Sequence, residues 1–367
     1  MLLPEADVQY RLRVESLAKP LADLDQRCGL FNNLPIDPTH EEWLRQRAWI
    51  RTIHGTTRIE GNTLSDIEVE ALLAGEGAAG ISQKEAREII GTREALSLAD
   101  RLAAEQVVPD ESVVREIHKR VLWNQSPLLT PGEYRKGENR VVDASGNSIF
   151  STPPSGDVPE LMRGFGSWLG AASGKDAAPV VAALAHLELV GIHPFNDGNG
   201  RTARAVSRLI LVRAGYALNG LVSLDAQLDL DRPAYFAAIR EAIGQAYDPP
   251  YDATPFVAYF LGSIVKSADY VLARIRGLGQ VMVGIRRAIV ERTLPPAMID
   301  GLAYAWVNRH IRAGDYRRLT GRSAQTTTRE LATAVRGGWL VPSGDKRGRY
   351  YVLGPRLLST PAQGEVN

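Results

Sequence analysis

Hydrophobic positions recur at helical spacing along most of the chain, and few segments show the alternation typical of strands. The run over residues 180–190 is apolar on nearly every side, which predicts a buried helix. That helix is expected to end at His193, because Pro194 disfavours helical geometry at the residue before it. A second helical pattern resumes near Asn199. The sequence therefore predicts two buried helices joined by a short loop.

A longer helical pattern precedes this pair in the chain. It begins near Asp37, and Thr39 with Glu42 predicts a capping box for its first turn. Gly61 fits the position just after a helix, where glycine adopts a left-handed conformation without steric cost. Two more capping boxes are expected to open helices further along, at Ser65 with Glu68 and at Ser82 with Glu85.

Strand patterns occur in two regions. Residues 139–154 predict a hairpin of two short strands around a Ser-Gly-Asn turn at 145–147. Near the C-terminus, residues 339–342 and 349–353 predict a second pair of strands. Two short helical patterns precede that pair, over residues 311–321 and 323–335.

Composition narrows the class of protein. With 367 residues, of which 44% are hydrophobic, the chain is long enough for two or three domains with full cores. The single cysteine, Cys28, excludes an internal disulfide and a cysteine cluster for zinc. The N-terminus lacks the apolar segment of a signal peptide, and no apolar run approaches the roughly 20 residues of a membrane span. We therefore expect a mostly α, cytoplasmic protein with no membrane partner.

Positive charge gathers in the C-terminal part. Between Arg309 and Tyr350 there are ten Arg and Lys residues and three Asp and Glu residues, although the whole chain has a net charge of only +1. The rest of the chain is therefore net negative. A basic helix and loop at this end suit contacts with DNA phosphates. The alternative is a module for packing or protein docking whose exposed arginines have no specific role.

The loop between the two buried helices holds the densest group of reactive side chains. His193 is poised for proton transfer near neutral pH, and Asp197 offers the hard oxygen that Mg²⁺ prefers. Glycines lie where the second helix begins, so unpaired backbone N–H groups and the positive end of the helix dipole can meet phosphate oxygens. Arg201 and Arg204 share one helix face, and guanidinium groups suit phosphates. These residues predict a site that binds a nucleotide polyphosphate and activates a nucleophile.

The string from His193 to Arg204 resembles the signature of the Fic family, H-P-F-x-[D/E]-G-N-G-R-x-x-R, and fills every specified position. Members of this family mostly transfer AMP from ATP to a hydroxyl side chain of a protein. The resemblance implies that His193 is the general base and that Asp197 holds Mg²⁺ or Mn²⁺ against the phosphates. It also implies that phosphate is bound by Gly198, Asn199, Gly200, Arg201 (at the β-phosphate) and Arg204 (at the γ-phosphate).

A second resemblance concerns the end of the N-terminal helical pattern. Fic proteins often carry an inhibitory helix with the pattern [S/T]-x-x-x-E-[G/N], which Thr56, Glu60 and Gly61 match. It implies that Glu60 pairs with Arg204 and prevents productive binding of the γ-phosphate. Spacing alone favours a surface charge beside a helix end. In some relatives the same glutamate positions a water for removal of AMP, and the sequence does not separate these two activities.

The predicted hairpin occupies the place of the Fic flap, whose strand edge can pair with a target peptide. A solvent-exposed hairpin without a partner is the alternative. The expected flap residues are Val141, Val142, Ile149 and Phe150.

Two other segments also resemble parts of Fic proteins. Tyr235 or Phe236 lies where relatives place an aromatic side chain against adenine, although two adjacent aromatics in a helix are commonly core residues. Upstream, the segment 131–135 (Pro-Gly-Glu-Tyr-Arg) and the preceding helix with His118 are similar to the family as well. We interpret His118 as structural, because no ligand set surrounds it in the sequence.

The C-terminal helices and strands resemble a winged helix-turn-helix, which several bacterial Fic proteins carry at this end. We therefore expect a Fic-type helical bundle with a short β-hairpin flap, followed by a winged helix. The expected divisions are an N-terminal helical region over 1–105 with an inhibitory helix ending near residue 62, a Fic core over 106–265, linking helices over 266–292, a winged helix over 293–355 and a tail over 356–367.

The expected activity is Mg²⁺-dependent transfer of AMP from ATP to a Ser, Thr or Tyr hydroxyl, held low by Glu60. The target is an unidentified protein, with the chain itself as one option. Removal of AMP, use of another nucleotide donor, and a DNA-binding regulator whose Fic core senses ATP are open alternatives. His193 argues against a pure sensor, because ATP sensing needs no base there. The oligomeric state is open, with a homodimer as one alternative.

Overall fold

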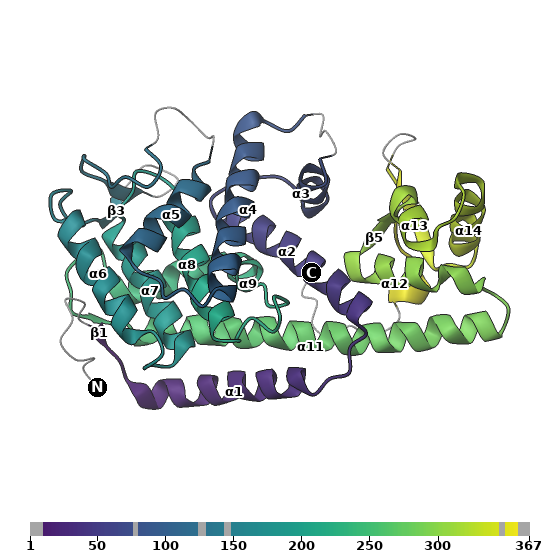
Figure 1. Cartoon of the computed structure of the whole chain (residues 1–367), viewed down its shortest axis with the longest axis horizontal. Coiled ribbons are helices and arrows are strands. Elements are labelled where there is room, and N and C mark those ends of the chain that lie inside the picture. The colour runs from purple at the N-terminus through teal and green to yellow at the C-terminus, as the bar shows by residue number, and fades with distance from the viewer. Residues whose placement is uncertain (1–9, 76–79, 124–129, 143–147, 345–348, 359–367) are drawn as a thin grey trace. The chain divides into compact units, whose positions relative to one another are not determined.

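The computed structural model describes residues 10–75, 80–123, 130–142, 148–344 and 349–358. The chain divides into two compact units: unit 1 comprises Met1–Asn32 and Ala48–Ala268, and unit 2 comprises Asn33–Arg47 and Asp269–Asn367. Two of the three divisions fall inside long helices, α2 (Pro38–Ile59) and α11 (Thr254–Val290), and the third follows the end of α1 (Val14–Asn32); all three helices are labelled in Figure 1. The finer division expected from the sequence stays a prediction.

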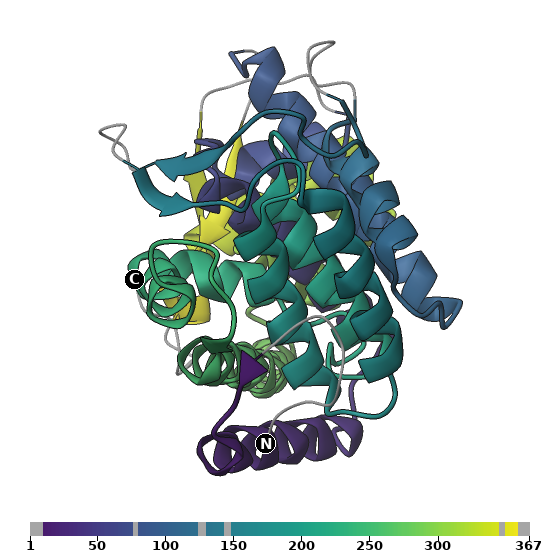
Figure 2. The same ribbon diagram turned by 90° about the vertical axis from the view of Figure 1, so that its left-hand side faces the viewer.

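Unit 1 is built mainly of helices. Its centre is the pair α7 (Ala178–Ile192) and α8 (Asn199–Arg213), which pack side by side (Figure 2). Because α7 has no polar face, nearly all of its residues are buried, as predicted. The other helices of the unit are α1 (Val14–Asn32), α3 (Asp66–Leu73), α4 (Gln83–Ala104), α5 (Glu111–Val121), α6 (Val158–Ala172), α9 (Leu224–Leu230) and α10 (Arg232–Ile243). Of these, α4 and α5 pack on α8, and α6 and α10 pack on α7.

Two of the predicted helix starts are confirmed. Ser65 caps α3 in a full capping box with Glu68. At the start of α4 the Ser82 side chain accepts a hydrogen bond from the backbone N–H of Glu85. The Glu85 carboxylate accepts from the Ser82 hydroxyl (2.6 Å), so only the Ser82 half of the predicted capping box is found. These local contacts satisfy backbone donors that have no partner inside the helix.

The predicted capping box at Thr39 and Glu42 is wrong. Helix α2 begins at Pro38, and the carboxylate of Asp37 accepts from the backbone N–H groups of Thr39 (2.9 Å) and His40 (3.3 Å). Proline suits this first helical position because its missing N–H would have no partner inside the helix. The cap therefore lies two residues before the one expected.

A short hairpin in unit 1 confirms the strands predicted over 139–154. Strands β2 (Arg140–Val142) and β3 (Ser148–Ser151) run antiparallel, with Val141 opposite Phe150 (Figure 2). The predicted turn at 145–147 lies outside the described residues. Two short strands elsewhere in the unit, β1 (Tyr10–Arg11) and β4 (Tyr251–Asp252), pair in parallel.

Helix α11 is longer than the sequence analysis anticipates. It runs as one helix through residues 265 and 266, where a change to separate linking helices is expected. Contrary to the expectation from sequence, it is long and apolar enough, by length and composition, to cross a membrane. Its most apolar window is 56% buried inside the protein, which is also typical of a core helix.

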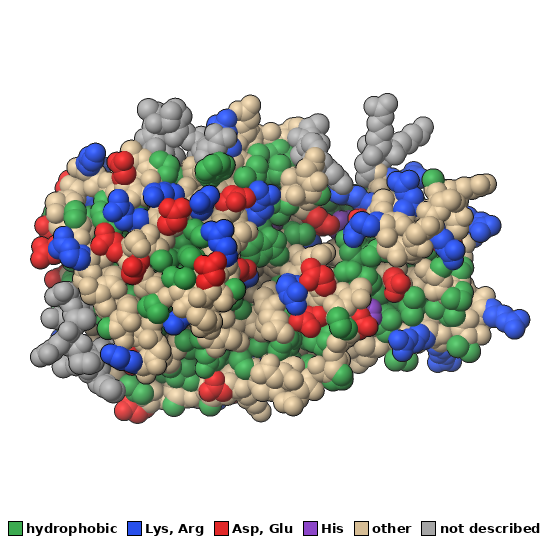
Figure 3. Space-filling model, in the orientation of Figure 1, with side chains coloured by type: hydrophobic (Ala, Val, Ile, Leu, Met, Phe, Trp, Pro, Cys, Tyr) green, Lys and Arg blue, Asp and Glu red, His purple; other side chains and the backbone are tan. Residues whose placement is uncertain are grey.

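Unit 2 contains the helices and strands predicted near the C-terminus, except that residues 311 and 312 of the first predicted helix lie in a strand, β5 (His310–Arg312), which the sequence pattern did not predict. Trp306, Tyr316 and Leu331 are buried in its core. Lys and Arg side chains lie on the face of this unit that Figure 3 shows. Three strands form an antiparallel sheet in the order β5-β7-β6. The elements that lie wholly in unit 2 are a short 3-10 turn η1 (Pro296–Met298), α12 (Ile299–Asn308), β5 (His310–Arg312), α13 (Ala313–Thr320), α14 (Ala324–Arg336), β6 (Leu340–Ser343), β7 (Tyr350–Leu353) and α15 (Pro355–Leu358).

Candidate active site

His193 lies at the C-terminal end of α7 in a left-handed conformation, with φ of 51° and ψ of 58°. Few residues other than glycine adopt this conformation, and such strain concentrates at functional sites. The Nδ1 atom donates to the carbonyl of Val190 at 3.3 Å, which leaves Nε2 as the nitrogen that can accept a proton. Burial lowers the pKa of His193, so the ring is neutral near pH 7.

The loop after His193 is shaped by two buried side chains. The amide of Asn199 accepts from the backbone N–H of Phe195 (2.9 Å) and donates to its carbonyl (2.8 Å). His118 stacks on Phe195 with ring centroids 3.6 Å apart and hydrogen bonds through Nε2 to the carbonyl of Asp197. Burial lowers the pKa of His118 to about 4, so its ring stays neutral. In this structure Asn199 holds the loop, and its contact with a phosphate stays a prediction.

Asp197 and Arg201 face each other across this loop. The Asp197 carboxylate accepts from the backbone N–H of Gly198 (2.6 Å) and from Nη2 of Arg201 (3.3 Å), and its side chain is 51% exposed. The Arg201 side chain is buried, and its Nε and Nη1 atoms have no hydrogen-bond partner among the described residues. Buried guanidinium donors without partners are suited to an anion.

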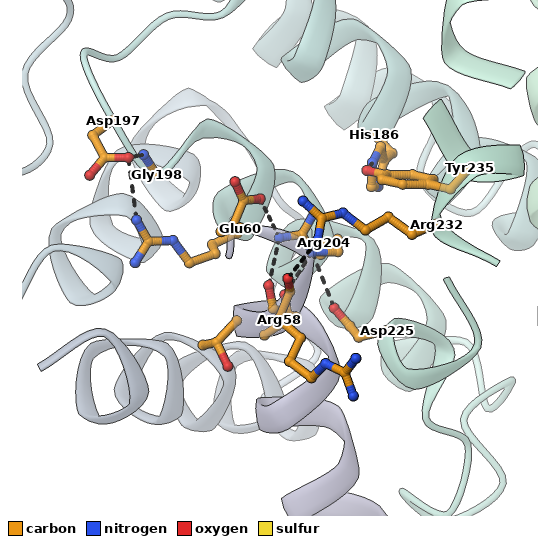
Figure 4. Close-up of polar contacts among 12 residues, drawn as sticks. Arg58, Glu60, His186, Asp197, Gly198, Arg204, Asp225, Arg232 and Tyr235 are labelled. Atoms are coloured by element: carbon orange, nitrogen blue, oxygen red, sulfur yellow. Dashed lines mark hydrogen bonds and ion pairs between the residues drawn. The ribbon is translucent and has the colours of Figure 1, made fainter. Parts of the chain in front are cut away.

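The structure brings the predicted pair Glu60 and Arg204 together, as Figure 4 shows. Nη2 of Arg204 donates to Oε1 of Glu60 (2.6 Å) and to the carbonyl of Thr56 (3.0 Å), while Nε donates to the Thr56 hydroxyl (2.6 Å). The Arg204 side chain is buried, and Glu60 follows the last residue of α2. The inhibitory pattern thus supplies three of the contacts that hold this guanidinium.

Opposite charges dominate the electrostatics of this pair. Partial burial would raise the pKa of Glu60, whose side chain is 39% exposed, but the guanidinium groups of Arg204 and Arg201 bring it below its usual value. Burial would lower the pKa of Arg204, but facing carboxylates raise it above its usual value. Glu60 can lie this close to Arg204 because residue 200 is glycine: an added Cβ at Gly200 would lie 2.4 Å from Oε1 of Glu60. The pair is therefore fully charged in the folded protein.

Asp225, at the start of α9, contacts Arg204, and no pattern in the sequence predicted this contact. Its Oδ1 lies 3.4 Å from Nε of Arg204, and Figure 4 shows the guanidinium between Glu60 and Asp225. Burial raises the pKa of the Asp225 carboxyl, against the opposing effects of Arg204 and the Thr56 hydroxyl. An acidic residue in the first turn of a helix is expected from the helix dipole alone, so no sequence signal marks this one.

A cavity of about 560 Å³ opens beside these groups. His193, Gly200, Arg204 and Glu60 line it together with residues of the hairpin and of α10. The hairpin contributes Val141, Ile149 and Phe150, while the side chain of Val142 lies outside the described residues. The described residues thus place the predicted base, the arginine predicted to bind phosphate and the predicted flap around one space.

The two candidate aromatics of α10 differ in exposure. Tyr235 is 1% exposed and its hydroxyl hydrogen bonds Nε2 of buried His186 (2.7 Å). Phe236 is 41% exposed at the cavity wall, with the guanidinium of Arg232 5.8 Å from its ring centroid. Phe236 is therefore better placed to meet a base than Tyr235.

The part of the chain that holds His193 and Arg204 is similar in sequence to known proteins. A model of the Fic/DOC family matches residues 109–211, which include His193 and Arg204 but not Glu60. A protein adenylyltransferase Fic from Drosophila ananassae is 35% identical over 174 residues, which are 47% of this chain and 34% of that protein. One from Drosophila willistoni is 34% identical over 198 residues, 53% of this chain and 38% of that protein. The chain thus spans little more than a third of the length of these relatives.

Solved structures show the same fold. A Fic family protein from Desulfovibrio desulfuricans superposes with a TM-score of 0.59 at 22% identity, over 93% of this chain and 96% of that one. Fic-1 from C. elegans superposes with a TM-score of 0.59 at 28% identity, over 72% of this chain and 74% of that one. Residues 109–211 therefore match the Fic/DOC family model, and His193 and the loop that follows it lie within this stretch.

Proposed function

We propose that this chain transfers AMP from ATP to a Ser, Thr or Tyr hydroxyl of a protein, and that Glu60 keeps the transfer slow. The observation that carries the proposal is the Glu60–Arg204 pair beside a neutral His193, all at the wall of one cavity. The curated relatives are named protein adenylyltransferases, which supports the same chemistry.

In the proposed reaction the target's hydroxyl oxygen attacks the α-phosphorus of ATP. The bond from this phosphorus to the oxygen that bridges it to the β-phosphate breaks, and pyrophosphate leaves. The hydroxyl proton passes to Nε2 of His193, which can accept it because the ring is neutral and Nδ1 is held by Val190. AMP stays on the target through a phosphodiester bond.

The start of α8 is the proposed phosphate site. Its backbone N–H groups, with Gly198 and Gly200 beside them, suit the α- and β-phosphates. So do the two nitrogen atoms of Arg201 that have no hydrogen-bond partner among the described residues. Arg204 is assigned to the γ-phosphate. Since Nη2 of Arg204 already donates to Glu60 and Thr56, a γ-phosphate that binds this nitrogen must replace Glu60.

Asp197 fits the role of ligand to Mg²⁺ or Mn²⁺. Its carboxylate is half exposed, and the described residues hold no cluster of three or more His, Cys, Asp or Glu side chains. This suits Mg²⁺, which usually takes one or two carboxylates and completes its shell with phosphates and water. When bound, the ion would neutralise charge on the phosphates and on the leaving pyrophosphate.

Incubation with α-labelled ATP and cell lysate tests the proposal. We expect weak labelling by the wild type, labelling at least about tenfold stronger by Glu60→Gly, and none when His193→Ala is added. Glu105→Gly, which removes an exposed carboxylate at the end of α4, is the matched control and should behave as the wild type. No gain in Glu60→Gly would contradict the brake, and labelling that survives His193→Ala would contradict the transferase.

Removal of AMP is a second candidate reaction at this site. Glu60 lines the same cavity as His193, and its side chain is 39% exposed, so a water could be held between the carboxylate and bound AMP. A labelled target produced by Glu60→Gly separates the two. Release of AMP by the wild type but not by Glu60→Gln would favour removal, whereas no release by either would leave only transfer.

We further propose that unit 2 is a winged helix that binds DNA through α14. The exposed N-terminal end of this helix presents Gln325, Thr328 and Arg329, while its acidic residue, Glu330, is buried against Tyr316. Polar and basic side chains there suit base edges and phosphates.

A gel shift with genomic fragments at several salt concentrations tests DNA binding. Arg329→Ala should weaken binding and lower the slope against log salt by about 1 if it meets a phosphate. Arg287→Ala, an exposed arginine of α11 that pairs with Glu291, is the control and should change neither. No shift at low salt, or equal loss in both variants, would point to protein docking instead.

A further inference from the structure

Arg135, in the segment between α5 and the hairpin, is enclosed in unit 1 and is 2% exposed. Its guanidinium donates to three main-chain carbonyls, from Nε to His193 (2.9 Å), from Nη1 to Gly137 (3.1 Å) and from Nη2 to Pro153 (2.5 Å). Its own backbone N–H donates to the carbonyl of Pro194 (2.9 Å). One residue thus joins the loop of the candidate base to the segments that enter and leave the hairpin.

The burial of this charge calls for a physical reason. Among the described residues Arg135 forms no ion pair, and burial lowers its pKa more than nearby Glu138 raises it. A buried charge without a counter-ion lowers stability, so an apolar side chain that merely filled this space would be more stable. The planar guanidinium, however, presents five N–H donors in fixed directions, which the single nitrogen of lysine cannot do. Its geometry therefore accounts for its presence.

Other contacts tie the two ends of the hairpin together without reaching the loop of His193. The Thr152 hydroxyl donates to the carbonyl of Asn139 (2.7 Å), and the Ser155 hydroxyl donates to the Glu138 carboxylate (3.0 Å). The hairpin base is therefore held closed by its own residues, and the guanidinium of Arg135 connects this closed base to the candidate base.

We propose that Arg135 is a positioning residue, which sets the distance between the hairpin and His193. This inference rests on the proposed function. Val141 and Phe150 of the hairpin line the same cavity as His193, so a target strand paired to the hairpin brings its hydroxyl to a place that Arg135 fixes. Proton transfer needs heavy atoms about 3 Å apart, and a misplacement of about 1 Å can cost a hundredfold in rate.

A positioning role for Arg135 predicts different effects on the rate of transfer and on the affinity for ATP. The phosphates of ATP are assigned to the start of α8 and to Arg204, neither of which hydrogen bonds the Arg135 side chain. Loss of Arg135 is therefore expected to slow transfer while ATP still binds. A residue that only stabilises the unit would affect both.

Arg135→Lys and Arg135→Gln in the Glu60→Gly background test the proposal. We expect transfer to a target protein to fall at least about tenfold, with the Kd for ATP changed by less than about twofold. Backbone amide exchange is expected to accelerate over residues 137–142, 148–155 and 193–198, but not in α4 or α8. Thr152→Val, which removes a contact inside the hairpin base, is the matched control and should leave transfer within about twofold of the parent.

Three results would overturn the proposal. These are unchanged transfer in both variants, an equal loss of transfer and ATP affinity, and faster exchange spread over α4 and α8. If the Glu60→Gly parent itself transfers nothing, the proposed function is wrong, and hydrogen exchange still decides the inference. Acceleration confined to the hairpin and the loop of His193 would then support the link through Arg135, and unchanged exchange would refute it.

Discussion

Oδ1 of Asp225 lies 3.4 Å from Nε of Arg204, and both side chains are enclosed in unit 1. The carboxylate of Glu60, 2.6 Å from Nη2 of the same guanidinium, is by contrast 39% exposed and lines the large cavity. Asp225 lines a separate cavity of about 20 Å³, which is room for one water. In the proposed function, Glu60 gives way to a phosphate while Asp225 stays, so Arg204 is not left as an unpaired buried charge.

A double-mutant cycle tests whether the two carboxylates share this role. We expect Glu60→Gln and Asp225→Asn each to lower the free energy of unfolding by about 1 kcal/mol, because one counter-ion remains in each variant. The combined variant should lose about 3 kcal/mol or more, since it leaves a buried guanidinium unpaired. Calorimetry of the full chain measures the loss.

Adding Arg204→Met to the combined variant is the control for this cycle. With no charge left to compensate, part of the lost stability should return. Losses that simply add in the double variant would show that Glu60 and Asp225 do not substitute for each other.

The sequence predicts those parts of the site that are contiguous or follow a repeated pattern. The residues from His193 to Arg204 lie in one loop and the helix start that follows it, so the sequence alone predicts that they form one site. Glu60 is 144 residues away from Arg204, and only the inhibitory pattern pointed to it. The contacts of Asp225 and Arg135 depend on how distant segments pack, which no local spacing encodes.

The same limit explains the ambiguity in α10. Tyr235 and Phe236 are adjacent, so they point in different directions from one helix, and hydropathy does not distinguish them. Packing against α7 decides the question by enclosing Tyr235 beside His186. The start of α2 is ambiguous in the same way. Asp37 and Thr39 are both favourable capping residues, and only the backbone conformation decides which of them caps the helix.

Gly55 gives a prediction about the docking of α2. An added Cβ there would lie 2.7 Å from the backbone of Ala226 at the start of α9, so one of the two helices must shift. We expect Gly55→Ala to lower the free energy of unfolding by about 1–3 kcal/mol and to raise labelling by ATP, because the shift moves the turn that carries Glu60. Thermal unfolding and the labelling assay measure the two effects.

Gly29→Ala in α1 is the matched control, since a Cβ there meets nothing within 4 Å. Alanine in an open helical position should raise stability by up to about 1 kcal/mol without any effect on labelling. If both alanine variants behaved alike, close packing at Gly55 would not be what holds α2 in place.

Two buried histidines predict a loss of stability in acid. Burial lowers the pKa of His118 to about 4 and that of His186 to about 3, whereas an unfolded histidine titrates near 6.5. Below pH 6.5 the unfolded state therefore binds more protons, and stability falls as the pH drops from about 7 toward 4. The loss between pH 7.5 and 5 should be about 2 kcal/mol for each histidine.

Urea unfolding at pH 7.5, 6 and 5 measures this slope. His118→Gln removes one of the two titrating rings, so its stability should fall less steeply with acid than that of the wild type. The difference in slope should correspond to the uptake of up to one proton on unfolding. Identical slopes would mean that His118 takes up its proton over the same pH range in the folded and the unfolded protein, and so does not keep the neutral form that its contacts with Gly132 and Asp197 require.

Phe236 is expected to hold the base of the nucleotide, because it is the more exposed aromatic of α10 at the cavity wall. Stacking of a base on an aromatic ring contributes about 1–3 kcal/mol. Phe236→Ala in the Glu60→Gly background should therefore weaken ATP binding about tenfold, with little loss of stability. Calorimetric titration with ATP and with inorganic tripolyphosphate separates base from phosphate contacts, since the second ligand should bind as before.

Tyr235→Phe is the companion variant and should show the opposite behaviour. It leaves Nε2 of buried His186 without its hydroxyl partner, so stability should fall by about 1–3 kcal/mol while the affinity for ATP changes less than about twofold. Weaker binding of tripolyphosphate in Phe236→Ala, to the same extent as ATP, would contradict a contact with the base, because tripolyphosphate has no base to lose. The apolar wall of the cavity would then serve the target chain rather than the nucleotide.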